Sequence, residues 1–285
     1  MVGDRTESFW VDQQYPIKLI GVDDRVFSYR EASPPEKGTP VIAVLHGIGS
    51  GSGSWAHLLS HFKNQYRVLA WDAPGYNCST PLSENRPGAL GYAHALHEFL
   101  DALDVAPKII LGHSLGAMMA GAYVAEVDPS IPILILADPA NGYGQATHEV
   151  RKEKLNDRLN MIHQLGPHEM AEKRSRNLLS TSPPPEAIAL VKWNMRKVTV
   201  RGYEQASYTL ANGNLVGRAA EYHGNVLVLC GSEDLVTPVD ACRDVAQAYG
   251  NSLFKELPGL GHASYVEGPG IFNEVVDDYL ETLVA

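Results

Sequence analysis

Residues 109–119 read IILGHSLGAMM and carry the strongest structural signal in the chain. The apolar run Ile109 to Leu111 predicts a buried strand, and the residues from Leu115 onward predict a helix. Between them lies Gly112-His113-Ser114-Leu115-Gly116, a G-x-S-x-G pattern. So tight a turn needs glycine on both sides, because a side chain there would collide with the folded backbone. The segment therefore predicts a turn that exposes the Ser114 hydroxyl above a sheet.

Further apolar runs along the chain are short, rich in Val, Ile and Leu, and do not alternate with polar residues, as is typical of parallel strands covered on both faces. Segments of helical period separate them, which predicts a doubly wound α/β sheet with helices on both faces. Residues 17–22 and 26–30 flank Asp23-Asp24 and predict an antiparallel hairpin at the sheet edge. The predicted strands are 41–45, 68–71, 109–111, 133–137, 226–230 and 253–257, and the predicted helices are 55–62, 90–103 and 115–127.

This alternation stops at residues 141–222, which contain charged helical patterns and a triple proline but no buried strand. We expect residues 1–140 and 223–285 to form one α/β core domain, with 141–222 inserted as a helical cap. The insertion holds 12 Lys and Arg against 8 acidic residues, and the remainder holds 11 against 25. Either Lys197, Arg196 or Arg201 draws an anionic substrate inward, or these charges are solvated helix faces on an acidic core.

Composition restricts the possible partners. The chain has 285 residues, 45% of them hydrophobic, and a net charge of −10, which indicates a globular protein and argues against nucleic acid binding. Three widely spaced cysteines form no disulfide framework, and Met1 to Trp10 lacks the apolar stretch of a secretory signal. No apolar run approaches the ~20 residues of a membrane-spanning helix. We therefore expect a cytoplasmic protein with no membrane partner, and the histidine spacing predicts no metal site.

A serine hydroxyl is a weak nucleophile, so it needs a base and an acid that orients the base. His262 lies in the glycine-rich loop after predicted strand 253–257, which would deliver it to the top of the sheet. Asp234 directly follows predicted strand 226–230, and the order Ser, Asp, His suits this architecture. Asp138, at the end of the preceding strand, is the main rival for the acid, and Glu233 is the weaker alternative.

The loop after predicted strand 41–45 contains six glycines or serines in the run Gly47 to Gly53 besides its apolar Ile48. Glycines let backbone approach a bound carbonyl, so we expect the Ile48 and Leu115 N–H groups to form an oxyanion hole. A phosphate loop is the rival interpretation, but no Gly-Lys-Ser/Thr follows. We expect His46 to stabilise this loop and Asp72 to hold the turn that follows it in the chain.

Five motifs together resemble the α/β-hydrolase superfamily, across essentially the whole chain. They are His46-Gly47-Ile48-Gly49, Asp72-Ala73-Pro74-Gly75-Tyr76, the turn at Ser114, Gly231-Ser232-Glu233-Asp234 and Gly261-His262-Ala263-Ser264. The resemblance implies that residues 141–222 roof an active site and that no cofactor or metal takes part.

Within the superfamily, residues 71–75 and 262–267 resemble 3-oxoadipate enol-lactonase-like hydrolases and their carboxylesterase relatives. Meta-cleavage C–C hydrolases are also similar, but they have Asn before the nucleophile and Trp after the catalytic histidine, where this chain has His113 and Ala263.

The expected activity is hydrolysis of a carboxylic ester or lactone through an acyl-enzyme, on a small and partly apolar substrate. The alternatives are a C–C hydrolase of a vinylogous diketone, a cofactor-free oxygenase and a receptor-like binder on the same fold. We expect a small-molecule partner, and a homodimer is compatible with the sequence. The candidate substrate-binding residues are Met118, Trp193, Tyr203, Val236 and Tyr265.

Overall fold

The computed structural model describes residues 9–34, 36 and 38–283. Within them lies one eight-stranded sheet in the order β1-β2-β4-β3-β5-β6-β7-β8, in which β1–β2 and β2–β4 pair antiparallel and all other pairs are parallel. The predicted fold class and hairpin are confirmed. The strands are β1 (Lys18–Val22), β2 (Arg25–Ala32), β3 (Val41–Leu45), β4 (Arg67–Trp71), β5 (Ile109–His113), β6 (Ile133–Ala137), β7 (Asn225–Gly231) and β8 (Ser252–Leu257).

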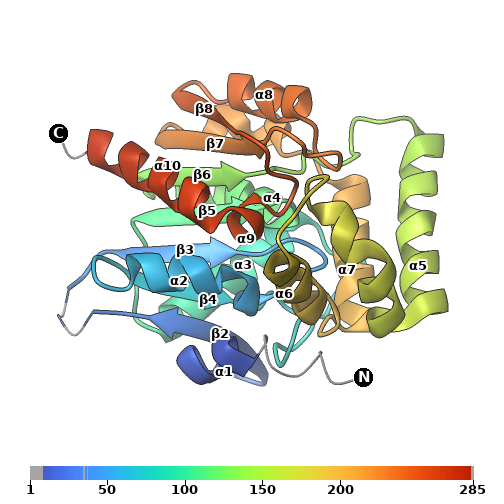
Figure 1. The fold of residues 1–285 in the computed structure, drawn as a ribbon, viewed down its shortest axis with the longest axis horizontal. Coiled ribbons are helices and arrows are strands. Elements are labelled where there is room, and N and C mark those ends of the chain that lie inside the picture. Colours follow the sequence, from blue (N-terminus) through green and yellow to red (C-terminus); the bar gives the residue numbers. More distant parts are fainter. Residues whose placement is uncertain (1–8, 35, 37, 284–285) are drawn as a thin grey trace.

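Helices cover both faces of the sheet (Figure 1). On one face α2 (Ala56–Phe62) packs against α10 (Pro269–Thr282), and on the other α3 (Ala89–Ala102) packs against α4 (Leu115–Ala122). The remaining elements of the core are α1 (Phe9–Gln14), η1 (Ser52–Trp55), η2 (Tyr123–Val127), α8 (Val239–Ala248) and α9 (Ser264–Glu267). Strands β3, β5, β6 and β7 are almost wholly buried, as their uninterrupted apolar sequences predict.

The chain between β6 and β7 contributes no strand to the described structure. It forms α5 (His148–Arg174), η3 (Ser175–Leu178), α6 (Pro185–Met195), α7 (Val200–Asn212) and η4 (Val216–Glu221). Figure 1 shows α5, α6 and α7 beyond the carboxyl ends of the parallel strands. We call residues 141–222 the helical segment.

Close backbone contact fixes α7 to the core. The first turn of α7 meets the turn after β4 at two glycines: a Cβ added to Gly202 would lie 2.2 Å from the carbonyl oxygen of Gly75. Next to this contact, the Thr199 hydroxyl donates a 2.6 Å hydrogen bond to the same carbonyl. These contacts fix the position of the helical segment on the core.

Residues 1–8 lie outside the described part of the chain, and so does most of the segment on which the expectation of no secretory signal rests. Among the described residues, every helix is too short or too polar to cross a membrane. Cys78, Cys230 and Cys242 are free thiols in this structure.

Candidate active site

The Ser114 turn has the geometry that its two glycines predict. A Cβ added to Gly112 would lie 2.3 Å from the carbonyl oxygen of Gly116, and one added to Gly116 would lie 2.2 Å from that of Leu45. Ser114 itself has φ 53° and ψ −115°, a backbone conformation that costs a non-glycine residue free energy and is typical of functional turns. The turn therefore holds the Ser114 side chain at the carboxyl edge of the sheet.

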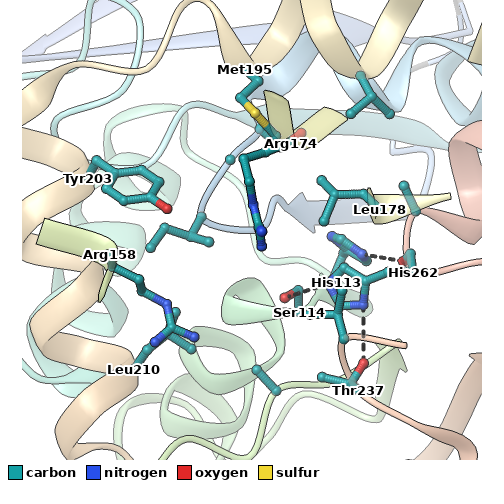
Figure 2. Close-up of a pocket in the computed structure, with 18 of the residues that line it drawn as sticks. His113, Ser114, Arg158, Arg174, Leu178, Met195, Tyr203, Leu210, Thr237 and His262 are labelled. Carbon is teal, nitrogen blue, oxygen red and sulfur yellow. Dashed lines mark hydrogen bonds between the residues drawn. The ribbon is translucent and has the colours of Figure 1, made fainter. Parts of the chain in front are cut away.

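His262 reaches Ser114 from the loop after β8. The Ser114 hydroxyl and His262 Nε2 are 3.0 Å apart, and both side chains are almost fully buried. Figure 2 shows the two groups facing each other at the base of a cavity. At this distance the serine O–H donates to the imidazole, which is the arrangement required of a nucleophile and its base.

Asp234 holds the far side of the imidazole. His262 Nδ1–H donates to Asp234 Oδ2 at 2.8 Å, and the Thr237 hydroxyl donates to the same oxygen at 2.7 Å. The backbone N–H groups of Val236 and Thr237 donate to Asp234 Oδ1 at 2.7 and 3.0 Å. Because burial opposes its charge but His262 and these donors favour it, the pKa of Asp234 lies below its ordinary value.

The same ion pair acts on the histidine. Burial lowers the pKa of His262, but the facing Asp234 carboxylate, with a smaller contribution from Asp138, raises it above its ordinary value. An imidazole that gains a proton more readily is a stronger base toward a serine hydroxyl.

The rival carboxylates are engaged elsewhere. Asp138 accepts from the Gly231 N–H at 2.8 Å and from the Ser264 hydroxyl at 2.5 Å. Burial and the neighbouring Asp234 charge raise the pKa of Asp138 to about 7. Glu233 accepts from the backbone and hydroxyl of Thr181 instead. Only Asp234 among the three has a hydrogen bond to His262 in the described structure.

Asp138, Cys230 and Asp234 also place candidate metal-binding atoms within 4.8 Å of one another. The residues do not suit a metal ion, because both carboxylates already accept hydrogen bonds and the Cys230 thiol donates to backbone carbonyls. The neighbouring Cys242 and burial raise the pKa of Cys230, which disfavours the thiolate that metals require.

The glycine-rich loop lies directly beside Ser114. A Cβ added to Gly47 would come within 3.1 Å of the Ser114 Cβ, which is a tight contact. The neighbouring Ile48 lines the cavity, and Leu115 is the first residue of α4, where backbone N–H groups have no partner within the helix. The two N–H groups predicted to form an oxyanion hole thus belong to segments that flank Ser114.

Two histidines support these loops. His46 donates from Nδ1 to the Gly47 carbonyl and accepts the Ala73 N–H at Nε2. His113 donates from Nε2 to the His262 carbonyl at 2.8 Å, and burial lowers its pKa to about 3. Asp72 accepts from the Ser52 N–H, the Asn77 amide and the Ser28 hydroxyl, which ties the loop to the next turn.

A cavity of about 750 Å³ lies over Ser114 and His262, between the core and the helical segment. Of the predicted substrate-binding residues, Tyr203, Val236 and Tyr265 line it. Tyr265 is stacked on Trp55 with ring centroids 4.1 Å apart.

The structure places two other candidates away from the cavity. Met118 packs against the backbone at Gly142 and Gly213. Trp193 lies over Gly53, and the Lys197 ammonium lies over the Trp193 ring, 3.2 Å from the ring centroid. Neither residue is in the cavity lining, and their role in substrate binding stays a prediction. Helical periodicity indicates the buried face of a helix but not which neighbour covers it.

The three cations considered for attracting an anion are not in the cavity lining. Arg196 pairs with Glu172, Lys197 stacks on Trp193, and Arg201 donates to Asn85. Lys154, Arg158 and Arg174 of α5 line the cavity instead. These three cations were not predicted from the sequence; Gly166-Pro167, a break in a long helical pattern, was the available signal for a bend in α5.

A sequence model described as the alpha/beta hydrolase fold matches residues 40–269. The chain belongs to this family. A protein of Mycoplasma genitalium named "Putative esterase/lipase 2" is 28% identical over 275 residues, which cover 93% of this chain and 98% of that protein. "Putative carbamate hydrolase RutD" of Escherichia coli is 23% identical over 261 residues, covering 88% of this chain and 95% of that protein.

Solved structures share the fold of this hydrolase. The enol-lactonase of Burkholderia xenovorans LB400 superimposes with a TM-score of 0.82 at 20% identity, covering 93% of this chain and 100% of that one. A thermophilic esterase of Thermogutta terrifontis gives a TM-score of 0.81 at 20% identity, covering 93% and 98%. The superfamily resemblance is confirmed, and the chain is an enzyme of the hydrolase class.

Proposed function

We propose that this hydrolase cleaves a carboxylic ester or lactone through an acyl-enzyme, with Ser114 as nucleophile, His262 as general base and Asp234 as the orienting acid. The continuous hydrogen-bonded chain Ser114–His262–Asp234, with separations of 3.0 and 2.8 Å at the base of a cavity, carries the proposal. The relatives named esterase/lipase and carbamate hydrolase support acyl chemistry.

In the first half of the reaction His262 Nε2 takes the Ser114 proton while Oγ attacks the substrate carbonyl carbon. Asp234 holds the imidazole in the tautomer protonated at Nδ1 and stabilises the imidazolium. The imidazolium then gives its proton to the departing alkoxide or enolate as the C–O bond breaks. In the second half a water molecule loses its proton to His262 and attacks the acyl-enzyme. The imidazolium then returns that proton to Ser114 Oγ as the acyl C–O bond breaks, which releases the carboxylic acid and free Ser114.

The Ile48 and Leu115 N–H groups are proposed to stabilise the tetrahedral oxyanion, since both segments flank Ser114. The helical segment is proposed to be a cap that excludes water and bounds the substrate. Tyr203 comes from this segment, and Val236 and Tyr265 from the core. Apolar side chains such as Met195 and Leu210 complete the walls, which suits a partly apolar substrate.

The replacement Ser114→Ala tests the proposal. It removes the nucleophile, so hydrolysis of short aryl esters, enol lactones and aryl carbamates should fall at least about 1,000-fold. Purified enzyme and variant are compared by the release of acid or phenol. Labelling by a fluorophosphonate probe should be lost together with activity, whereas circular dichroism should stay unchanged.

The alternatives give different results in the same panel. Cleavage of vinylogous diketones without ester hydrolysis would replace the proposal with C–C hydrolysis. Oxygen uptake that survives Ser114→Ala would assign Ser114 an orienting role. The direct 3.0 Å hydrogen bond from Ser114 to the base favours nucleophilic attack over an orienting role.

A further inference from the structure

The cavity above Ser114 is lined on one side by cations of α5. Lys154, Arg158 and Arg174 face it, and Asp157 is the acidic side chain in its lining. The Lys154 ammonium is 3.3 Å from Glu153, and Asp157 is exposed to solvent. Arg174 is exposed as well and Arg158 is half-buried, so the lining carries three cations against one carboxylate and this wall is net positive.

Neither guanidinium is neutralised by a carboxylate. Arg158 donates to the Lys154 carbonyl at 2.9 Å and lies over the Tyr143 ring, 5.3 Å from its centroid. Within the described residues, no ion pair involves Arg158 or Arg174. By contrast Arg196, directly after α6, and Arg218 on η4 pair with acidic residues. Arginines that line a cavity without a carboxylate partner suit an anionic ligand.

The bend in α5 brings the two cations to one space. Gly166 has a φ of 65°, and with Pro167 it interrupts the helix between Arg158 and Arg174. Figure 2 shows both guanidinium groups pointing into the cavity above Ser114, Arg158 from one wall and Arg174 from another, with the Tyr203 ring nearby. Burial raises the pKa of Tyr203 and both cations act against that rise, so one phenol interacts electrostatically with both.

We propose that Arg158 and Arg174 bind a carboxylate on the substrate, remote from the bond that is cleaved, so that the enzyme selects monoesters or lactones that carry a free acid. This substrate class rests on the proposed ester hydrolysis at Ser114. A guanidinium presents paired N–H donors in a plane that matches a carboxylate. The neighbouring apolar wall at Leu178, Met195 and Leu210 accommodates the chain between the two ends.

The test compares nitrophenyl monoesters of straight-chain dicarboxylic acids of increasing length with the same compounds capped as terminal methyl esters. We expect the enzyme to have a higher kcat/KM for the free acids. Arg158→Gln and Arg174→Gln should each reduce that kcat/KM roughly 10- to 100-fold, because each removes a charge-assisted hydrogen bond, and the methyl esters should change less than about threefold. Lys152→Gln is the matched control, since Lys152 is exposed on the same helix and does not line the cavity.

A preference for the methyl esters, or a preference for the free acids that persists in the double variant, would overturn the proposal. A binding measurement tests the arginine site separately from the reaction. Calorimetric titration of the free dicarboxylic acids into Ser114→Ala protein should give a Kd that weakens when both arginines are replaced. An unchanged Kd would contradict the arginine site. If the wild-type enzyme hydrolyses none of these esters, only the proposed reaction is contradicted.

Discussion

Two buried carboxylates lie side by side beneath His262 and have opposite electrostatic environments. Asp234 accepts from His262, the Thr237 hydroxyl and two backbone N–H groups, which outweigh its burial and lower its pKa. Asp138 accepts only from Gly231 and Ser264 in the described structure, and burial raises its pKa to about 7. Donor number and the facing imidazole therefore decide which of the two carboxylates has the lowered pKa.

Replacing these acids separately should distinguish their roles. Asp234→Asn leaves an amide against Nδ1 and favours the wrong imidazole tautomer, so kcat should fall roughly 1,000- to 10,000-fold. Asp138→Asn keeps both hydrogen bonds of Asp138, because an amide can accept from Gly231 and donate to the Ser264 hydroxyl. Its effect on kcat at neutral pH should be small. Equal losses in the two variants would contradict the assignment.

The pH profile of kcat/KM provides a second readout of the same replacements. His262 must be neutral to accept the serine proton, and its pKa is raised, so activity should decline as the pH falls through a value above 6.5. Asp138→Asn removes one charge that raises this pKa, so the acid limb should move to lower pH. A limb that moves to higher pH would show that the two groups do not interact in this way.

At the scale of single elements, the strands and the Ser114 turn could be predicted because each depends on local sequence. Uninterrupted runs of Val, Ile and Leu predicted the strands, and Gly112 and Gly116 predicted the turn. The contacts explain why glycine is needed in the turn. Gly116 lies against the backbone of β3, which cannot move aside as a flexible side chain would.

Gly116→Val tests this account of the turn. A Cβ there would lie 2.2 Å from the Leu45 carbonyl oxygen, so α4 must move away from β3. We expect the free energy of unfolding to fall by about 3 kcal/mol or more, measured with denaturant. Gly91→Ala in α3 is the control, because its nearest neighbours are side-chain atoms at 3.6 and 3.7 Å. That variant should gain about 0.5 to 1 kcal/mol.

The side chains on the cavity wall could not be predicted in the same way. The charged residues of α5 are spread around the whole helix and leave no apolar stripe, so its sequence does not indicate which face meets the core. The direction of Arg174 depends on the bend at Gly166 and on the packing of α5 against α6 and α7. These are long-range contacts, which a pattern within one segment does not contain.

For the molecule as a whole, the buried acids should make stability depend on pH. The pKa of Asp138 rises from 3.8 to about 7 on folding, so the folded state holds this proton more tightly than the unfolded chain. The contribution of Asp138 therefore weakens the fold as the pH rises from about 4 to about 7. His262, whose pKa is also raised, acts in the same direction; Asp234, whose pKa is lowered, stabilises the fold above its unfolded pKa and ceases to do so on acidification.

Asp138→Asn should flatten this dependence. The difference in unfolding free energy between about pH 5 and about pH 8 should shrink by about 2 kcal/mol relative to the wild type. Urea titrations of both proteins at the two pH values measure it. Comparing the slopes cancels any loss that is independent of pH, and parallel curves for the two proteins would refute the expectation.

The division of labour between sheet and α5 has an evolutionary consequence. The proposed catalytic side chains come from loops at the edge of the sheet, whereas the cavity cations come from one bent helix. Because distant sites contribute nearly additively, changes confined to residues 148–174 can exchange one ligand charge for another while bond cleavage stays intact. Proteins with this architecture can thus change substrate through single substitutions, each of which leaves an active enzyme.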